Sequence, residues 1–194
     1  MRQVCRALLV AIVALTWVGC GSSSSPSSPS SAGSTLNVML KDSPFSDAKA
    51  LLVTFSEVSA HVSGAGGFSV LPFTGGATTR TCDLKKLTTA QDVLGTGTLA
   101  AGHYTQVRLV VTSAVLYFDN ASSGAACAPS IAAPAGRTAS VTVNSGDVKL
   151  NREFDVTSSG ATTILVDFNG DQSIRQEGNG SYSMSPVIAV VSVS

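Results

Sequence analysis

Residues 148–156 alternate between apolar and polar side chains, and this pattern constrains the fold more than any other in the chain. The apolar side chains are Val148, Leu150, Phe154 and Val156, and the polar ones are Lys149, Asn151, Glu153 and Asp155. Successive side chains of a β-strand point to opposite faces, so the pattern predicts a half-buried strand. Arg152 falls on the apolar side. We expect it at the sheet's rim, with its stem on the core and its head in water.

Short segments of similar character recur through the rest of the chain, separated by turns rich in glycine, serine and asparagine. The predicted strands cover residues 36–40, 50–62, 68–73, 82–84, 104–112, 141–143, 162–168 and 187–193. Residues 113–118 either continue the strand at 104–112 or form the next one. One helical turn is expected over residues 88–94, capped by Thr88 or Thr89. Such spacing with little helical pattern predicts an all-β fold, a single antiparallel β-sandwich of immunoglobulin- or transthyretin-like type.

Two of these strands carry more specific expectations. Within residues 50–62, Leu51 and Phe55 have the opposite parity to Val58 and Val62. An extra residue must reset the alternation, which predicts a β-bulge near Ser56. The segment 187–193 is almost wholly apolar, which predicts a central strand covered on both faces.

The N-terminus has the three parts of an export signal. Arg2 and Arg6 precede an apolar run over residues 7–14, and Cys20 follows small residues. The run is shorter than the about 20 residues that cross a bilayer. The pattern resembles a bacterial lipoprotein signal, although Trp17 stands where that pattern usually has Leu. It predicts a signal peptide over residues 1–19 and acylation of Cys20, including palmitate. The alternative is an ordinary secretory signal and a secreted protein.

A serine-rich stretch follows the cysteine. Residues 20–34 include Pro26 and Pro29 and hold nothing apolar to bury, which predicts a disordered tether. Its root-mean-square reach is roughly 20 Å. The β-sandwich domain, residues 35–194, would therefore be held near a membrane of the cell envelope. Gly21, rather than Asp, after the cysteine favours the outer membrane if the cell is Gram-negative.

Three blocks of sequence resemble domain-of-unknown-function family 4382 of bacteria and archaea. The first block holds Leu36–Pro44, Val53–Phe55 and Val58. The second holds Asp83–Leu84 and Leu99–Leu109. The third holds Val148–Leu150, Val166–Phe168, Ser173–Ile174, Tyr182 and Pro186–Ile188. The resemblance covers about residues 35–191. It implies a β-sandwich-like domain in a lipoprotein or secreted protein, and it implies no particular activity. Asn169, Cys82 and Cys127 depart from the family pattern.

Two cysteines, Cys82 and Cys127, remain once Cys5 leaves with the signal and Cys20 is acylated. An exported chain with two such cysteines favours a disulfide. A reactive thiol or metal pair is the alternative, and it lacks a CxxC spacing.

The acidic segment near residue 170 is the one candidate metal site. Asp167, Asn169, Asp171 and Glu177 could share a calcium ion. The spacing departs from the EF-hand loop, so the sequence favours a strand end and a turn over a metal site, and no cofactor is expected. Asp42, beside Pro44, is interpreted as an Asx-type turn. His61 and His103 are expected on the surface. No Gly-x-Ser-x-Gly elbow or phosphate-binding loop is present, so we expect no enzyme.

Charge and aromatic content narrow the remaining functions. The formal net charge is zero and no basic cluster is present, which disfavours nucleic acid as a partner. Two classes remain. The first is a structural or accessory envelope protein that pairs with another protein through a strand edge or sheet face. The second is a ligand- or glycan-binding adhesion module, which the aromatic content of only 6 % weakens because sugars commonly stack on such rings.

Overall fold

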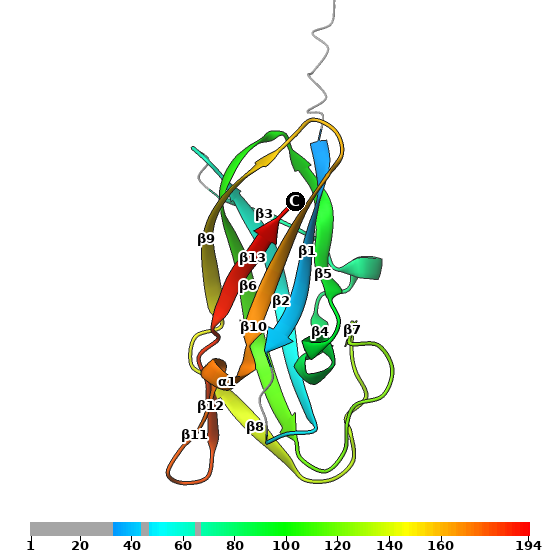
Figure 1. The fold of residues 1–194 in the computed structure, drawn as a ribbon, viewed down its shortest axis with the longest axis vertical. Helices are drawn as coiled ribbons and strands as arrows, with labels where there is room; N and C mark the ends of the chain where they lie inside the picture. Colours follow the sequence, from blue (N-terminus) through cyan, green and yellow to red (C-terminus); the bar gives the residue numbers. More distant parts are fainter. Residues whose placement is uncertain (1–32, 44–46, 65–66) are drawn as a thin grey trace, which may run out of the picture. The chain divides into compact units, whose positions relative to one another are not determined.

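The computed structural model describes residues 33–43, 47–64 and 67–194 (Figure 1). The predicted signal peptide, Cys20 and nearly all of the tether lie outside these residues. The strands are β1 (Gly33–Ser43), β2 (Ala50–Val62), β3 (Phe68–Val70), β4 (Arg80–Asp83), β5 (Asp92–Ala100), β6 (Gly102–Tyr117), β7 (Cys127–Ala128), β8 (Thr138–Val143), β9 (Asp147–Val156), β10 (Ala161–Asn169), β11 (Ile174–Gln176), β12 (Tyr182–Met184) and β13 (Ile188–Val193). Three short helices accompany them: η1 (Thr74–Gly76), η2 (Leu84–Thr88) and α1 (Gly170–Ser173). No helix in this part of the chain is long and apolar enough to cross a membrane.

Two sheets make up the domain. The first has the order β13-β10-β1-β5. The second has the order β11-β12-β8-β6-β2-β4-β7, with β3 also paired to β2 and β9 also paired to β6. The all-β sandwich is confirmed. It is not purely antiparallel as expected, because β1 pairs with β10 and β8 pairs with β12 in parallel.

The core lies between the two sheets and follows the alternation of the strands. In β1, Leu36, Val38 and Leu40 are fully buried, and the β10 partners of Val38 and Leu40 are Ile164 and Val166. Phe55 of β2 and Phe168 of β10 add the largest buried rings together with Tyr104. Removing one such side chain from water contributes about 1.5–3 kcal/mol, so these inward positions hold the sheets together.

The predicted irregularity of β2 is present. The register of β2 on β6 shifts between Phe55 and Glu57, which confirms the bulge at Ser56. The ladder between β9 and β6 shifts as well, because Gln106 pairs with Asn151 while Tyr104 pairs with Phe154. Arg152 lies in this irregular stretch and is exposed, as expected for the sheet's rim.

The prediction of a central strand at residues 187–193 is wrong. β13 is the edge strand of the first sheet, and its pairing partner is β10. Ile188, Val190 and Val193 pack against the core, whereas Val191 is 50 % exposed. A continuous apolar run does not distinguish a doubly covered strand from an edge strand that leaves apolar side chains in water.

The predicted helical turn at residues 88–94 is also misplaced. The turn occurs earlier, in η2, because the carboxylate of Asp83 accepts the N–H of Lys85 and caps it. Residues from Asp92 onward pair with β1 instead. Gly95 permits the close approach of β5 to β2 in the facing sheet, since a Cβ there would lie 3.1 Å from the side chain of Val58. Tertiary pairing thus prevails over a local capping pattern.

Candidate functional site: an open sandwich edge and an adjoining polar pocket

The sandwich is open along the side where β13 and β9 lie. Each of these strands has a single pairing partner, β10 for β13 and β6 for β9. They lie side by side at the same edge of the two sheets (Figure 1). A groove of about 310 Å³ runs between them. Its lining residues are Lys149, Leu150, Asn151 and Arg152 of β9 and Ile188, Ala189 and Val190 of β13.

The backbone of β13 has free hydrogen-bonding groups toward this groove. Asn169 donates its N–H to the carbonyl of Val187 at 2.8 Å. Bonded and non-bonded pairs alternate in an antiparallel ladder, so the N–H and C=O groups of Ile188 and Val190 point away from β10. The register shift that follows leaves Val191 as an extra residue. The regular part of the free edge is therefore Ile188–Val190.

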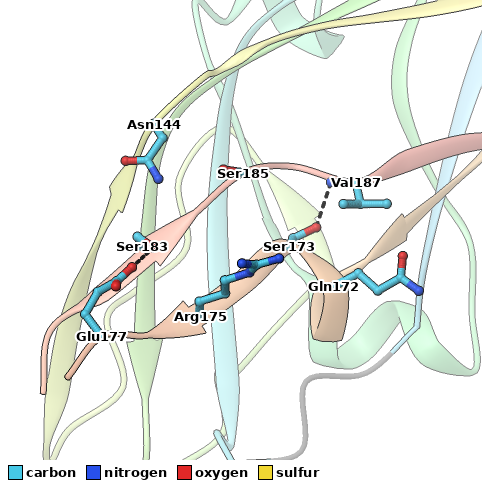
Figure 2. Close-up of a pocket in the computed structure, with 8 residues that line it drawn as sticks. All are labelled: Asn144, Gln172, Ser173, Arg175, Glu177, Ser183, Ser185 and Val187. Atoms are coloured by element: carbon cyan, nitrogen blue, oxygen red, sulfur yellow. Dashed lines mark hydrogen bonds between the residues drawn. The ribbon is translucent and has the colours of Figure 1, made fainter.

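A polar pocket of about 350 Å³ adjoins the start of this strand (Figure 2). It is lined by Asn144, Gln172, Ser173, Arg175, Glu177, Ser183, Ser185 and Val187. Alternation in the β11–β12 hairpin produces it. One face of the hairpin turns Ile174, Tyr182 and Met184 to the core, and the other turns Arg175 and Ser183 to the pocket.

Ser173 holds the pocket wall together. Its hydroxyl donates to the carbonyl of Asn169 at 2.5 Å and accepts the N–H of Val187 at 2.8 Å. The N–H of Ser185 donates to the carbonyl of Ser173 at 2.9 Å. Because Ser173 is buried and fully bonded, it fixes α1 against the start of β13 and is not free to contact a ligand.

The arginines at this edge form no ion pair, in contrast to the other arginines of the described residues. Arg80 pairs with Asp92, Arg108 with Glu57 and Arg137 with Asp119. The other two arginines of the described residues, Arg152 and Arg175, form no ion pair there. Arg152 lines the groove and Arg175 lines the pocket. Both unpaired guanidinium groups therefore lie on one edge of the domain.

The structure does not bring the four candidate calcium ligands together. Asp167 points to the outer face of its sheet and pairs with Lys41 at 3.4 Å. Asn169 caps α1 by accepting the N–H of Gln172 at 2.9 Å, while the side chain of Asp171 is exposed. Glu177 accepts the hydroxyl of Ser183. Within the described ranges, no group of three or more His, Cys, Asp or Glu side chains could hold a metal ion.

The predicted disulfide between Cys82 and Cys127 is present, and these residues also pair across β4 and β7. Two carboxylates, that of the buried Asp83 and that of the partly exposed Asp92, fasten the same loop. Asp83 accepts the hydroxyl of Ser122 at 2.5 Å and the N–H of Leu51 at 3.1 Å. Asp92 accepts the N–H of Cys127 at 3.0 Å. The disulfide and these hydrogen bonds together hold the loop that carries Cys127, which indicates a structural role for the two cysteines.

The histidines lie apart from the pocket. His61 shares a hydrogen bond with Thr105 and lies against the ring of Phe68. His103 is half exposed and bonds Asp155 at 2.8 Å. A third cavity, of about 460 Å³, lies beside η2 and is lined by Lys41, Leu87, Thr88, Thr89, Ala90 and Gln91. It contains no unpaired arginine and no free strand edge.

Asp42 is a buried acid that the sequence interpretation placed in a turn. It continues the inward parity of β1 and is only 6 % exposed. Neither carboxylate oxygen has a hydrogen bond of ordinary geometry within the described residues. Burial raises the pKa of Asp42 to about 8; the carboxylates of Asp167 and Asp171 add to the rise, and the N–H of Gly170 and the charge of Lys85 oppose it.

Sequence reasoning placed Arg152 at the rim of its sheet but missed the pocket and the unpaired Arg175. Arg175 sits in a segment with no clear alternation, and its isolation becomes visible only when the partners of the other arginines are known. The apolar run at residues 187–193 was the available signal for the edge, and it was assigned to the wrong environment.

No curated protein and no solved structure shows significant similarity to this chain. A family model matches residues 33–186, which run from the start of β1 to Pro186, just before β13. The match agrees with the resemblance carried by the three sequence blocks. The chain belongs to the family described as Domain of unknown function (DUF4382).

Proposed function

We propose that this protein is a non-catalytic accessory lipoprotein of the cell envelope, and that it binds another envelope protein by adding an extended segment of it to β13. The observation that carries the proposal is the apolar edge strand itself. Ile188–Val190 leaves its outward N–H and C=O groups without strand partners, beside a groove open to solvent. An edge of this kind is a template for strand addition.

Charge at the groove specifies the partner segment. Lys149 and Arg152 line it, and neither forms an ion pair with another described residue. An extended segment with an acidic side chain would neutralise them, while its backbone paired with Ile188 and Val190. The bulge at Val191 confines pairing to the first half of β13. Bulges commonly protect edges from indiscriminate pairing, so a short free stretch fits a selective partner.

The cavities favour a protein partner over a glycan. None of the three is lined by a Trp, Tyr or Phe side chain. Tyr182, which precedes the pocket residue Ser183 in the chain, packs its ring against that of Phe118 at a centroid distance of 5.8 Å. A sugar-binding surface would need exposed rings on which to stack, so glycan binding has no specific feature in its favour.

Proline at Val190 tests the edge. The Val190→Pro variant removes the outward N–H, and the matched Val190→Ala variant keeps that N–H while losing similar core contacts. A photo-crosslinking side chain at the exposed position of Ala189, in full-length protein in cells, should give one defined adduct that Val190→Ala keeps and Val190→Pro loses. The same crosslinker at Val70, which is 60 % exposed on β3, is the site control. Identical adducts in both variants, or none at Ala189, contradict the proposal.

The anchor has a separate test. Cys20→Ser should move the protein from the membrane fraction to the soluble fraction, because several acyl chains are needed for stable attachment. Cys5→Ser, which alters a cysteine of the predicted signal peptide, is the matched control and should leave membrane attachment unchanged. Persistence of Cys20→Ser in salt-washed membranes, or release by Cys5→Ser alone, rules out anchoring at Cys20.

A further inference from the structure

We propose that the polar pocket binds a terminal carboxylate, that of an extended segment that ends at the start of β13. The inference rests on the proposed strand addition and names the end of the segment that is recognised. The pocket supplies a cation and hydrogen-bond donors for a carboxylate, and it lies at the end of the groove where the C-terminus of such a segment would be. Capture of a chain terminus together with strand pairing is an established mode of peptide recognition.

Arg175 supplies the cation. It follows Ile174 in β11, and cross-strand pairing sets it beside Ser183 on the pocket face of the hairpin. Figure 2 shows its guanidinium group directed across the pocket toward Ser173 and away from Glu177. It makes no ion pair within the described part of the chain, whereas Arg80, Arg108 and Arg137 all do. A planar guanidinium binds a carboxylate with two parallel hydrogen bonds.

Neutral donors line the same pocket. The amides of Asn144 and Gln172 and the hydroxyl of Ser185 line the pocket, and none is hydrogen-bonded through its side chain to another described residue. The carboxylate of Glu177 is already bonded to the hydroxyl of Ser183, at the other end of the pocket from the guanidinium (Figure 2). The pocket therefore offers an unpaired guanidinium group and neutral hydrogen-bond donors to an anion of carboxylate size.

The position of the pocket selects a chain end. Val187 lines the pocket, and the next residue, Ile188, lines the groove. A segment that pairs antiparallel to Ile188–Val190 therefore reaches the pocket within one or two residues, and its C-terminus points there. The side chain of Val187 is 39 % exposed and would contact an apolar last residue. The segment would thus have an acidic residue opposite Arg152 and an apolar C-terminal residue.

Binding of paired peptides tests the inference. The probes are acetylated EVTVV with a free C-terminus, the same peptide with a C-terminal amide, and N-acetylvaline, each titrated against the isotope-labelled mature chain by NMR. The free acid should bind about 10- to 100-fold more tightly than the amide, the range expected for a hydrogen bond to a charged group. Arg175→Gln should reduce the affinity for the acid to that for the amide. Arg152→Gln, the matched control, should weaken both peptides equally.

The outcomes separate this inference from the proposed function. Equal binding of acid and amide, unchanged by Arg175→Gln, overturns the carboxylate site while leaving strand addition intact. A preference for the acid that depends on Arg175 but is unaffected by Val190→Pro overturns strand addition instead. N-acetylvaline that binds as tightly as the peptide acid shows a site for small free carboxylates and overturns the chain-terminus assignment. Absence of binding by all three probes overturns both proposals.

Discussion

Replacing Cys82 and Cys127 together with serine is expected to lower the free energy of unfolding by about 4 kcal/mol. The two cysteines are separated by 45 residues in sequence, and the disulfide restricts the unfolded chain by closing that loop. Both positions are buried, at 0 % and 5 % exposure, so the new hydroxyl groups would also lack water. Urea unfolding of the oxidised wild type and the double variant, followed by circular dichroism, measures the difference.

The wild type under reducing conditions is the control for this experiment, because it lacks the bond but keeps the sulfur atoms in place. It should lose most of the same stability. A double variant as stable as the oxidised wild type would mean that the loop is held by its other contacts. Those contacts are real: Lys86 donates to the carbonyl of Gly124 at 2.8 Å, and Asp83 donates its N–H to the carbonyl of Ala126 at 2.7 Å.

Asp42→Asn is expected to remove most of the loss of stability that the wild type shows as the pH rises. The pKa of Asp42 is about 8 in the folded protein and near 3.8 when unfolded. Between these values the folded state keeps a proton that the unfolded state releases, so the stabilising effect of protonation is complete below 3.8 and falls as the pH rises to about 8. At about 1.4 kcal/mol per pH unit the full shift corresponds to about 6 kcal/mol, and solvent screening of the carboxyl reduces this to a few kcal/mol.

The measurement is the free energy of unfolding in urea at a series of pH values. The wild type should become less stable from acid to weakly alkaline pH, and Asp42→Asn should be flatter and more stable than the wild type at the alkaline end. Asp119→Asn is the contrasting variant. The N–H of Arg137, at 2.7 Å, lowers the pKa of Asp119, so its contribution is lost as the pH falls. The Asp119→Asn variant should therefore lose stability toward alkaline pH as the wild type does. An equal loss in Asp42→Asn would show that Asp42 is ionised in the folded protein.

Much of the fold follows from local patterns in the sequence. The alternation over residues 148–156 predicts β9, which spans Asp147–Val156, because one face of the strand is buried and the other is exposed to solvent. The bulge at Ser56 could be located because a change of parity requires an extra residue. The disulfide followed from export and from the number of cysteines. Each of these predictions depends on one strand or on composition, and needs no knowledge of neighbouring strands.

The errors concern which strands are neighbours. β13 was expected at the centre of a sheet, and its true place depends on β10, which lies about twenty residues earlier in the chain. Asp42 was assigned to a turn, although its burial depends on β10 and α1. The isolation of Arg175 likewise depends on which carboxylates the other arginines meet. The surroundings of these residues depend on which distant strands pair with one another. The alternation of apolar and polar residues within one strand does not reveal that pairing.

The place of β1 in the first sheet has a mechanical consequence. β1 lies between β10 and β5, and β10 in turn carries β13. If the chain is held before Gly33 and a partner pulls on β13, the load passes from β1 through β10 to β13 within one sheet. Force along these strands shears whole ladders at once, and the parallel register of β1 on β10 extends from Thr35 to Ser43. The domain would therefore transmit tension between an anchor and a bound protein without peeling open one hydrogen bond at a time.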